Sequence, residues 1–449
     1  MARTLAVVLL FLAVIPLSAE AWSNGGADAL GPRIRSHRRA SAWRAPEIVA
    51  SRRHPVSAVQ VADGPRRLAL VVWKRGLTDV GPARDGRMGG HASAVQVAVR
   101  RGARWGFGEP VILARRVDGP RVAMNPAGEA VIAWRDRRGR IQAVTRPPNG
   151  PLGEPQRVSG PGAGGYALAI GGDGSAVIAW EHGEFPDTSI RAAVRASGSA
   201  FGKPTEIGPV GALPVAAVNG VGEGIVTWED TGERDQPAMA SMMSPGGTFD
   251  LPQPIPNSER SNFRLSTAIA DDGTAIVLVN GELMRHVVKA SVLQPDGSFS
   301  PAASISGPGN SGNFGEVVVE GENFRAVWAG FSPTRVTTSR YLDHVGWSPP
   351  RVLGGRRDTL AAVESNTRGM TAVLTVRNLR MTTIRSFVRL PGEGWGPAEA
   401  VARFSNHGLT PNPALSLNAV GRALAAWGGS GKQSERGVFV AERWRLPAH

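Results

Sequence analysis

The hydrophobic positions of the chain fall into a repeating pattern. In each repeat, a turn is followed by a short run of small and β-branched residues, and most of these runs end in tryptophan. Six runs end in this way, at Trp73, Trp134, Trp180, Trp228, Trp328 and Trp427. Two further runs, 275–279 and 372–375, have a similar composition without the tryptophan. The eight runs recur about every 51 residues, and a fixed period of this kind is typical of repeat architectures.

A second motif keeps the same phase. It consists of an aromatic residue or leucine two or three positions before a proline. The copies begin at Trp43, Phe107, Leu152, Phe201, Phe249, Phe299, Trp347, Trp395 and Trp444. There are nine copies for eight runs, so one repeat is divided between the two ends of the chain.

Each repeat predicts four short strands, as residues 166–208 illustrate. Residues 166–170 are apolar, and the Gly-Gly-Asp-Gly turn at 171–174 suits a hairpin because glycine and aspartate tolerate positive φ. Strands then follow at 175–180, 189–196 and 204–208. Four strands per repeat predict an all-β fold, a β-propeller of eight four-stranded blades. The alternatives are a seven-bladed ring with one irregular repeat, and two smaller domains.

The divided repeat predicts how the ring closes. Near the C-terminus, three strands are expected at about 413–417, 422–427 and 436–443, and the chain ends where an outer strand would begin. Residues 43–49 carry the missing motif and the β-forming residues of that strand. We therefore expect the N-terminal strand to complete the last blade.

The N-terminus predicts export. Arg3, the apolar run 4–17 and the Ala19-x-Ala21 site form a signal peptide at 1–21, with an apolar core too short to span a membrane. We expect 22–42 to be a disordered basic segment and 43–449 a single propeller domain. The protein is then secreted and extracellular, without a membrane span; the alternative is an uncleaved anchor.

The amino-acid composition excludes several kinds of catalytic and metal site. The chain has no cysteine, which excludes disulfides, thiolate metal sites and cysteine nucleophiles. The eight histidines have no metal-ligand spacing, and no phosphate-binding loop or serine nucleophile elbow is present. We expect no metal and no cofactor. Eleven of the 12 tryptophans follow the repeat, which favours packing over ligand stacking.

The net charge of +14 is concentrated in the first third of the chain. Residues 22–160 contain 25 basic and 10 acidic residues, whereas 161–449 contain 25 basic and 26 acidic residues. Such a basic region attracts polyanions. Codon bias is the alternative for the preference of arginine over lysine, but it does not explain the concentration in one third.

Candidate binding residues lie in loops, where function is usually found. In a propeller, the loop after each second strand and the loop between blades lie on one face. On this face we expect a basic sector over the first two blades and an acidic one over the third and fourth. These are Arg52, Arg53, Lys74, Arg75, Arg115, Arg116, Arg135, Arg137 and Arg138, and then Glu181, Glu229 and Asp230. They either orient a polar partner or are ordinary solvated loop charges.

The strand phase and the hairpins Gly172-Asp-Gly174 and Asp271-Asp-Gly273 resemble those of secreted bacterial propellers of the TolB-like and sialidase-like kind. The resemblance covers 43–447 and implies the fold. A sialidase would also need the S-x-D-x-G-x-T-W repeat, which is absent, and a tyrosine nucleophile. The two tyrosines, Tyr166 and Tyr341, are expected on an inner strand and at the end of a third strand. No catalytic residue is therefore assigned from the resemblance.

These observations favour a secreted, non-enzymatic propeller that binds through its loop face. The expected partner is a cell-envelope polyanion, glycan or protein; we do not expect nucleic acid, and we expect a monomer. The alternative is a carbohydrate-active hydrolase or lyase of propeller fold, for which the carboxylates of the loop face would have to converge on a deep pocket.

Overall fold

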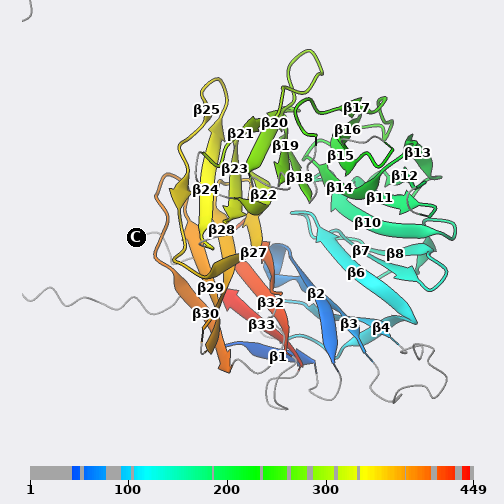
Figure 1. The fold of residues 1–449 in the computed structure, drawn as a ribbon. Helices are drawn as coiled ribbons and strands as arrows, with labels where there is room; N and C mark the ends of the chain where they lie inside the picture. Colours follow the sequence, from blue (N-terminus) through cyan, green and yellow to red (C-terminus); the bar gives the residue numbers. More distant parts are fainter. Residues whose placement is uncertain are drawn as a thin grey trace, which may run out of the picture. The chain divides into compact units, whose positions relative to one another are not determined.

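The computed structural model describes residues 43–50, 55–76, 93–102, 106–184, 187–232, 236–259, 264–280, 287–307, 312–330, 334–379, 381–405, 412–429 and 437–444. In this part of the chain the strands form eight antiparallel sheets (Figure 1). The only helical element described is a 3-10 turn, η1 (Pro65–Arg67). Among the described residues, no helix is long and apolar enough to cross a membrane. The predicted eight-bladed β-propeller is confirmed.

The first four blades follow one another along the chain. Blade 1 contains β2 (Val56–Asp63), β3 (Ala69–Arg75), β4 (Ala94–Arg100) and β5 (Val111–Arg115). Blade 2 contains β6 (Val117–Met124), β7 (Ala130–Asp136), β8 (Ile141–Arg146) and β9 (Gln156–Arg157). Blade 3 contains β10 (Ala163–Ile170), β11 (Ala176–His182), β12 (Ser189–Arg195) and β13 (Thr205–Gly208). Blade 4 contains β14 (Ala212–Val218), β15 (Gly224–Glu229), β16 (Ala238–Met243) and β17 (Gln253–Pro254).

The other four blades complete the ring. Blade 5 contains β18 (Leu265–Ile269), β19 (Ala275–Asn280), β20 (Val288–Val292) and β21 (Ala303–Ser304). Blade 6 contains β22 (Asn313–Glu320), β23 (Asn323–Ala329), β24 (Val336–Leu342), β25 (Gly346–Trp347) and β26 (Arg351–Val352). Blade 7 contains β27 (Asp358–Ser365), β28 (Thr371–Asn378), β29 (Met381–Arg389) and β30 (Glu399–Ser405). Blade 8 contains β31 (Ala414–Leu417), β32 (Ala423–Gly429), β33 (Gly437–Arg443) and β1 (Glu47–Ala50).

The first strand of each blade is an inner strand. Each inner strand contacts the inner strands of the blades before and after it, and β31 of blade 8 contacts β2 of blade 1. The ring therefore has no open side between its first and last blades.

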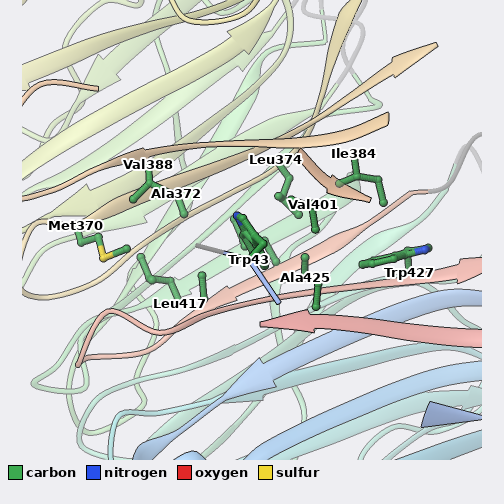
Figure 2. Packing of buried hydrophobic residues seen from close by; sticks show 13 residues of the cluster. Trp43, Met370, Ala372, Leu374, Ile384, Val388, Val401, Leu417, Ala425 and Trp427 are labelled. Carbon is green, nitrogen blue, oxygen red and sulfur yellow. The ribbon is translucent and has the colours of Figure 1, made fainter. Parts of the chain in front are cut away.

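The N-terminal strand closes the ring as predicted. Strand β1 pairs antiparallel with β33, with Glu47 opposite Val440, so the two ends of the described chain share one sheet (Figure 1). Trp43 pairs with Arg443 just before β1 begins. Its ring lies among residues of blades 7 and 8, including Leu374 and Ala425 (Figure 2). The Trp43 Nε1 donates to Ser386 Oγ at 2.7 Å.

The repeated tryptophans are core residues, which agrees with the packing role predicted for them. The six that end the second strands are buried between blades, and none is more than 4% exposed. Blade 5 has Val279 and blade 7 has Thr375 at the corresponding position, and both side chains are also buried. Tryptophan is therefore the usual residue at this buried position rather than a requirement.

Asparagine links the first hairpins of neighbouring blades. Four hairpins begin with an asparagine whose Oδ1 accepts backbone N–H groups of its own turn. In each case the Nδ2 donates to a backbone carbonyl of the next blade. These asparagines are Asn125, Asn219, Asn366 and Asn418. Asn418 bonds to Gly64 O at 3.2 Å and so joins blade 8 to blade 1.

A buried ion pair reinforces the same junction. The Arg422 guanidinium of blade 8 holds the Asp63 carboxylate of blade 1, and both side chains are almost completely buried. Burial raises the pKa of Asp63 to about 6, although Arg422 opposes the increase. Removal of one member of such a pair would leave the other charge buried and uncompensated.

The closure can be tested with Trp43→Ala. Because the indole is buried and hydrogen-bonded between blades 7 and 8, its loss should lower the free energy of unfolding by about 3–5 kcal/mol. Denaturant titration followed by circular dichroism measures the change. Trp347→Ala is the control, since Trp347 is only half-buried and should cost clearly less. Equal losses in the two variants would contradict the closing role of Trp43.

Candidate functional site

A pocket of about 390 Å³ lies between blades 1 and 2 on the face predicted to bind. It is lined by Lys74, Ser93, Arg116, Val117, Asp118, Arg135, Asp136, Arg137, Gly139 and Ala163. We call it the rim pocket. Four of the predicted basic residues, Lys74, Arg116, Arg135 and Arg137, meet here. Its volume is within the range of small-molecule sites.

The buried tryptophans position two of these side chains. Trp73 and Trp134 end the apolar part of β3 and β7, and each is followed directly by a basic residue. Because the core fixes each indole, Lys74 and Arg135 emerge where the two strands leave the core. The two tryptophans thus place Lys74 and Arg135 at equivalent positions of neighbouring blades.

The two carboxylates of the rim pocket are already engaged. Asp118 Oδ1 lies 2.8 Å from Lys74 Nζ, and Asp136 accepts hydrogen bonds from the side chain and backbone of Arg140. Burial is the largest single influence on Asp118 and would raise its pKa, but the hydrogen bonds from Lys74 and the Gly119 N–H, together with the charges of Lys74 and Arg135, hold the pKa below the usual value. In the same way, hydrogen bonds from Arg140 outweigh burial and lower the pKa of Asp136. Both groups are therefore ionised at neutral pH.

The three arginines of the rim pocket form no ion pair among the described residues, although Arg135 lies opposite Asp118 across β6 and β7 and its charge helps to lower the pKa of Asp118. Arg135 reaches only a backbone carbonyl, with its Nη1 3.4 Å from Ala163 O. Arg116 and Arg137 are exposed, and neither forms an ion pair there. Arg116 also adopts a φ of 59°, in the left-handed region that non-glycine residues rarely occupy. Strained backbone of this kind is concentrated at functional sites.

The other predicted basic residues lie outside the lining of the rim pocket. Arg115 ends β5 and Arg138 lies in the turn after β7, both exposed. Arg75 follows Lys74 on β3 and is half-buried. Arg52 and Arg53 lie outside the described residues.

The predicted acidic residues stay on blades 3 and 4 and do not line the rim pocket. Glu181 accepts backbone N–H groups of Gly165 and Leu213, at 2.9 and 2.8 Å, and so supports the inner strands of its own and the next blade. Asp230 accepts the N–H of Gly232 at 2.8 Å. Glu229 is only 8% exposed, and its Oε1 has no hydrogen-bond partner among the described residues. Burial alone raises the pKa of Glu229 to about 7.

The structure also shows two carboxylates that sequence reasoning missed. Glu316 on β22 and Glu364 on β27 belong to neighbouring inner strands, and Glu364 lines an axial cavity of about 580 Å³. Burial raises the pKa of Glu316 to about 7, and burial together with the nearby charge of Glu316 raises that of Glu364 to about 8. In the sequence, each of these glutamates is an isolated acidic residue in an apolar inner strand, and this was the feature that could have indicated a buried carboxyl group. Neither glutamate belongs to a motif.

Tyr166 lies on inner strand β10, as predicted. Its hydroxyl donates to the carbonyl of Gly119, and burial raises its pKa above the usual value. A buried, hydrogen-bonded phenol of high pKa does not suit a nucleophile. Tyr341 lies near the end of third strand β24, also as predicted.

Comparisons with known proteins support the fold. No family model matches the chain, and no curated protein matches it. The solved structure of the BP39L lectin from Burkholderia pseudomallei is 10% identical, with a TM-score of 0.54 over 79% of this chain and 100% of the lectin. A polysaccharide lyase, the PL25 ulvan lyase bound to -[GlcA(1-4)Rha3S]-, is 13% identical, with a TM-score of 0.47 over 71% of this chain and 90% of the lyase. At this identity, the likeness to the lectin shows a shared propeller fold.

The buried carboxyl of Glu229 predicts a pH-dependent stability. Its pKa is raised from 4.5 to about 7, so the folded protein keeps a proton that the unfolded chain releases between these values. The residue therefore destabilises the fold increasingly as the pH rises from about 4.5 to about 7. We expect Glu229→Gln to raise the free energy of unfolding by about 1–3 kcal/mol at pH 8 and to change it little at pH 4.5.

Thermal unfolding at the two pH values measures this difference. Glu154→Gln is the matched control, because Glu154 is exposed and should show no change with pH. A stabilisation by Glu229→Gln that is the same at both pH values would contradict the buried-carboxyl interpretation.

Proposed function

We propose that the protein binds an acidic glycan of the cell envelope, with an acidic group of that glycan held in the rim pocket. The observation that carries this proposal is the set of three arginines, Arg116, Arg135 and Arg137, that line one pocket without forming an ion pair among the described residues. The pocket contains four cationic side chains and two carboxylates, so its lining carries an excess of two positive charges.

The chemistry of the lining favours a carboxylate or sulfate ester as the bound group. A guanidinium presents parallel N–H donors that match the oxygens of such groups, and these charge-assisted bonds are strong. Arg115 and Arg138 are exposed and adjacent in sequence to lining residues. A polymer with repeated acidic groups would contact them as well, which favours a polyanion over a single small acid.

Binding without turnover is supported by the state of the carboxylates in the rim pocket. Hydrolysis of a glycosidic bond requires two carboxyl groups that can act on the substrate. Asp118 and Asp136 are ion-paired with Lys74 and Arg140, and both have lowered pKa values. A group in this state is a poor general acid. The envelope location follows from the predicted signal peptide at 1–21, which lies outside the described residues.

The test compares alginate, an acidic polysaccharide, with neutral dextran by biolayer interferometry. We expect the chain from Trp22 onward to bind alginate in preference to dextran, and less tightly as salt is raised. The double variant Arg116→Gln/Arg137→Gln should weaken alginate binding about tenfold or more, because two charge-assisted contacts are lost.

The matched control is Arg157→Gln/Arg351→Gln, which removes two exposed arginines of outer strands and so the same net charge. An equal loss of affinity in the control would show non-specific attraction and would overturn the proposed site. The same samples are assayed for new reducing ends and for unsaturated uronates. Their appearance would overturn binding without turnover and favour the hydrolase or lyase.

A further inference from the structure

Five blades carry an arginine at one structurally equivalent position. Each lies at the end of the third strand, opposite the first residue of the second strand. These residues are Arg100, Arg146, Arg195, Arg389 and Arg443, in blades 1, 2, 3, 7 and 8. Because the five arginines share one backbone position, they differ mainly in the side chains that surround them.

Four of the five pair with a carboxylate of the preceding blade. Arg100 lies 3.3 Å from Glu442 of blade 8, and Arg443 lies 2.9 Å from Glu399 of blade 7. Arg195 pairs with Glu129 of blade 2, and Arg389 lies 3.3 Å from Glu320 of blade 6. These pairs neutralise guanidinium groups that lie largely out of contact with water.

Arg146 has no such partner among the described residues. It is only 4% exposed, and its Nη1 donates to the carbonyls of Gly128, Pro147 and Pro148 at 3.1–3.2 Å. Its Nε is buried without a hydrogen-bond partner. Burial lowers the pKa of Arg146, and the nearby charge of Arg101 adds to the decrease. The guanidinium is therefore buried and cationic, and it is held by backbone carbonyls but by no carboxylate of the described residues.

Blade 1 has apolar residues at three of the positions that supply the acid elsewhere. Val99 of blade 1 has the position of Glu442 in blade 8, because each directly precedes the arginine that ends its third strand. Val111 of blade 1 has the position of Glu399 in blade 7, because each pairs with the residue three positions before that arginine. Leu68 precedes β3 as Glu129 precedes β7. A valine is shorter than a glutamate, so these exchanges remove both the carboxylate and the volume it would occupy.

A pocket of about 520 Å³ is found at this place. It is lined by Val97, Val99, Arg101, Gly106, Gly108, Glu109, Val111, Arg146 and Leu152. Most of the wall is aliphatic, Arg146 provides a buried cation, and Arg101 lies exposed at the edge. Glu109 is exposed and pairs with neither arginine. The rim pocket contains Ser93 at the start of β4, whereas this pocket lies near the other end of that strand.

We propose that this second pocket binds a small organic acid with an aliphatic body, whose carboxylate takes the place of the missing glutamate beside Arg146. The aliphatic part would lie against Val97, Val99, Val111 and Leu152. The site is separate from the rim pocket and does not depend on the proposed glycan binding.

The test is isothermal titration calorimetry with octanoate and its neutral isostere octanamide. We expect octanoate to bind at least about tenfold more tightly, because only the carboxylate compensates Arg146. Arg146→Met should reduce octanoate affinity about tenfold or more and leave octanamide nearly unchanged. Equal affinities of the two compounds for the native chain would overturn the proposal.

Val99→Glu tests the same idea without removing Arg146. The new carboxylate copies the position of Glu442, so it should pair with Arg146, abolish octanoate binding and raise the melting temperature by a few degrees. Retained octanoate binding in this variant would overturn the proposal even if Arg146→Met failed to fold. The rim-pocket variant Arg116→Gln/Arg137→Gln is the control and should bind octanoate as the native chain does; a matching loss there would show that octanoate uses the rim pocket instead.

Discussion

The junction between the first and last blades is the constraint on which the rest of the structure depends. Each blade is a four-stranded sheet that buries its two faces only against neighbouring blades, so an open ring would leave two apolar faces in water. At the junction, β1 completes the sheet of blade 8, Asn418 bonds to Gly64 and Arg422 holds Asp63. The same kinds of contact, an asparagine to the next hairpin and an arginine to an acid, recur around the ring.

Against this regular framework, the charges are distributed unevenly. Arginines at the ends of third strands are neutralised in four blades by acids from the blade before. Between blades 1 and 2, Arg146 near one end of β4 has no carboxylate partner among the described residues, and near the other end four cations share the rim pocket with two carboxylates. The concentration of basic residues in the first third of the chain therefore corresponds to an interface with an excess of positive charge. Both proposals place an anion there.

The sequence predicted the architecture well because the fold repeats. Eight copies of one hydrophobic pattern made the strands, the blade number and the closing strand recognisable, and Lys74 and Arg135 could be placed on one face through the tryptophans before them. The pairing of charges could not be predicted, since it depends on which side chains face one another across blades. Asp118 and Arg146 are examples: the first is paired and the second is not, and nothing near either residue in the sequence distinguishes them. Glu229 was expected in a loop, either as a binding residue or as a solvated charge, and the structure instead places it at the end of β15 and buries it.

Arg116, Arg135, Arg137 and Arg146 all lie where blades 1 and 2 meet, and none of them forms an ion pair among the described residues. Anomalous diffraction from crystals soaked in bromide tests this most directly, because bromide binds where positive charge lacks a partner. We expect bromide peaks beside Arg146 and in the pocket of Arg116, Arg135 and Arg137, and none beside the paired Arg100, Arg195 and Arg443. Peaks at the paired arginines, with none between blades 1 and 2, would contradict this expectation.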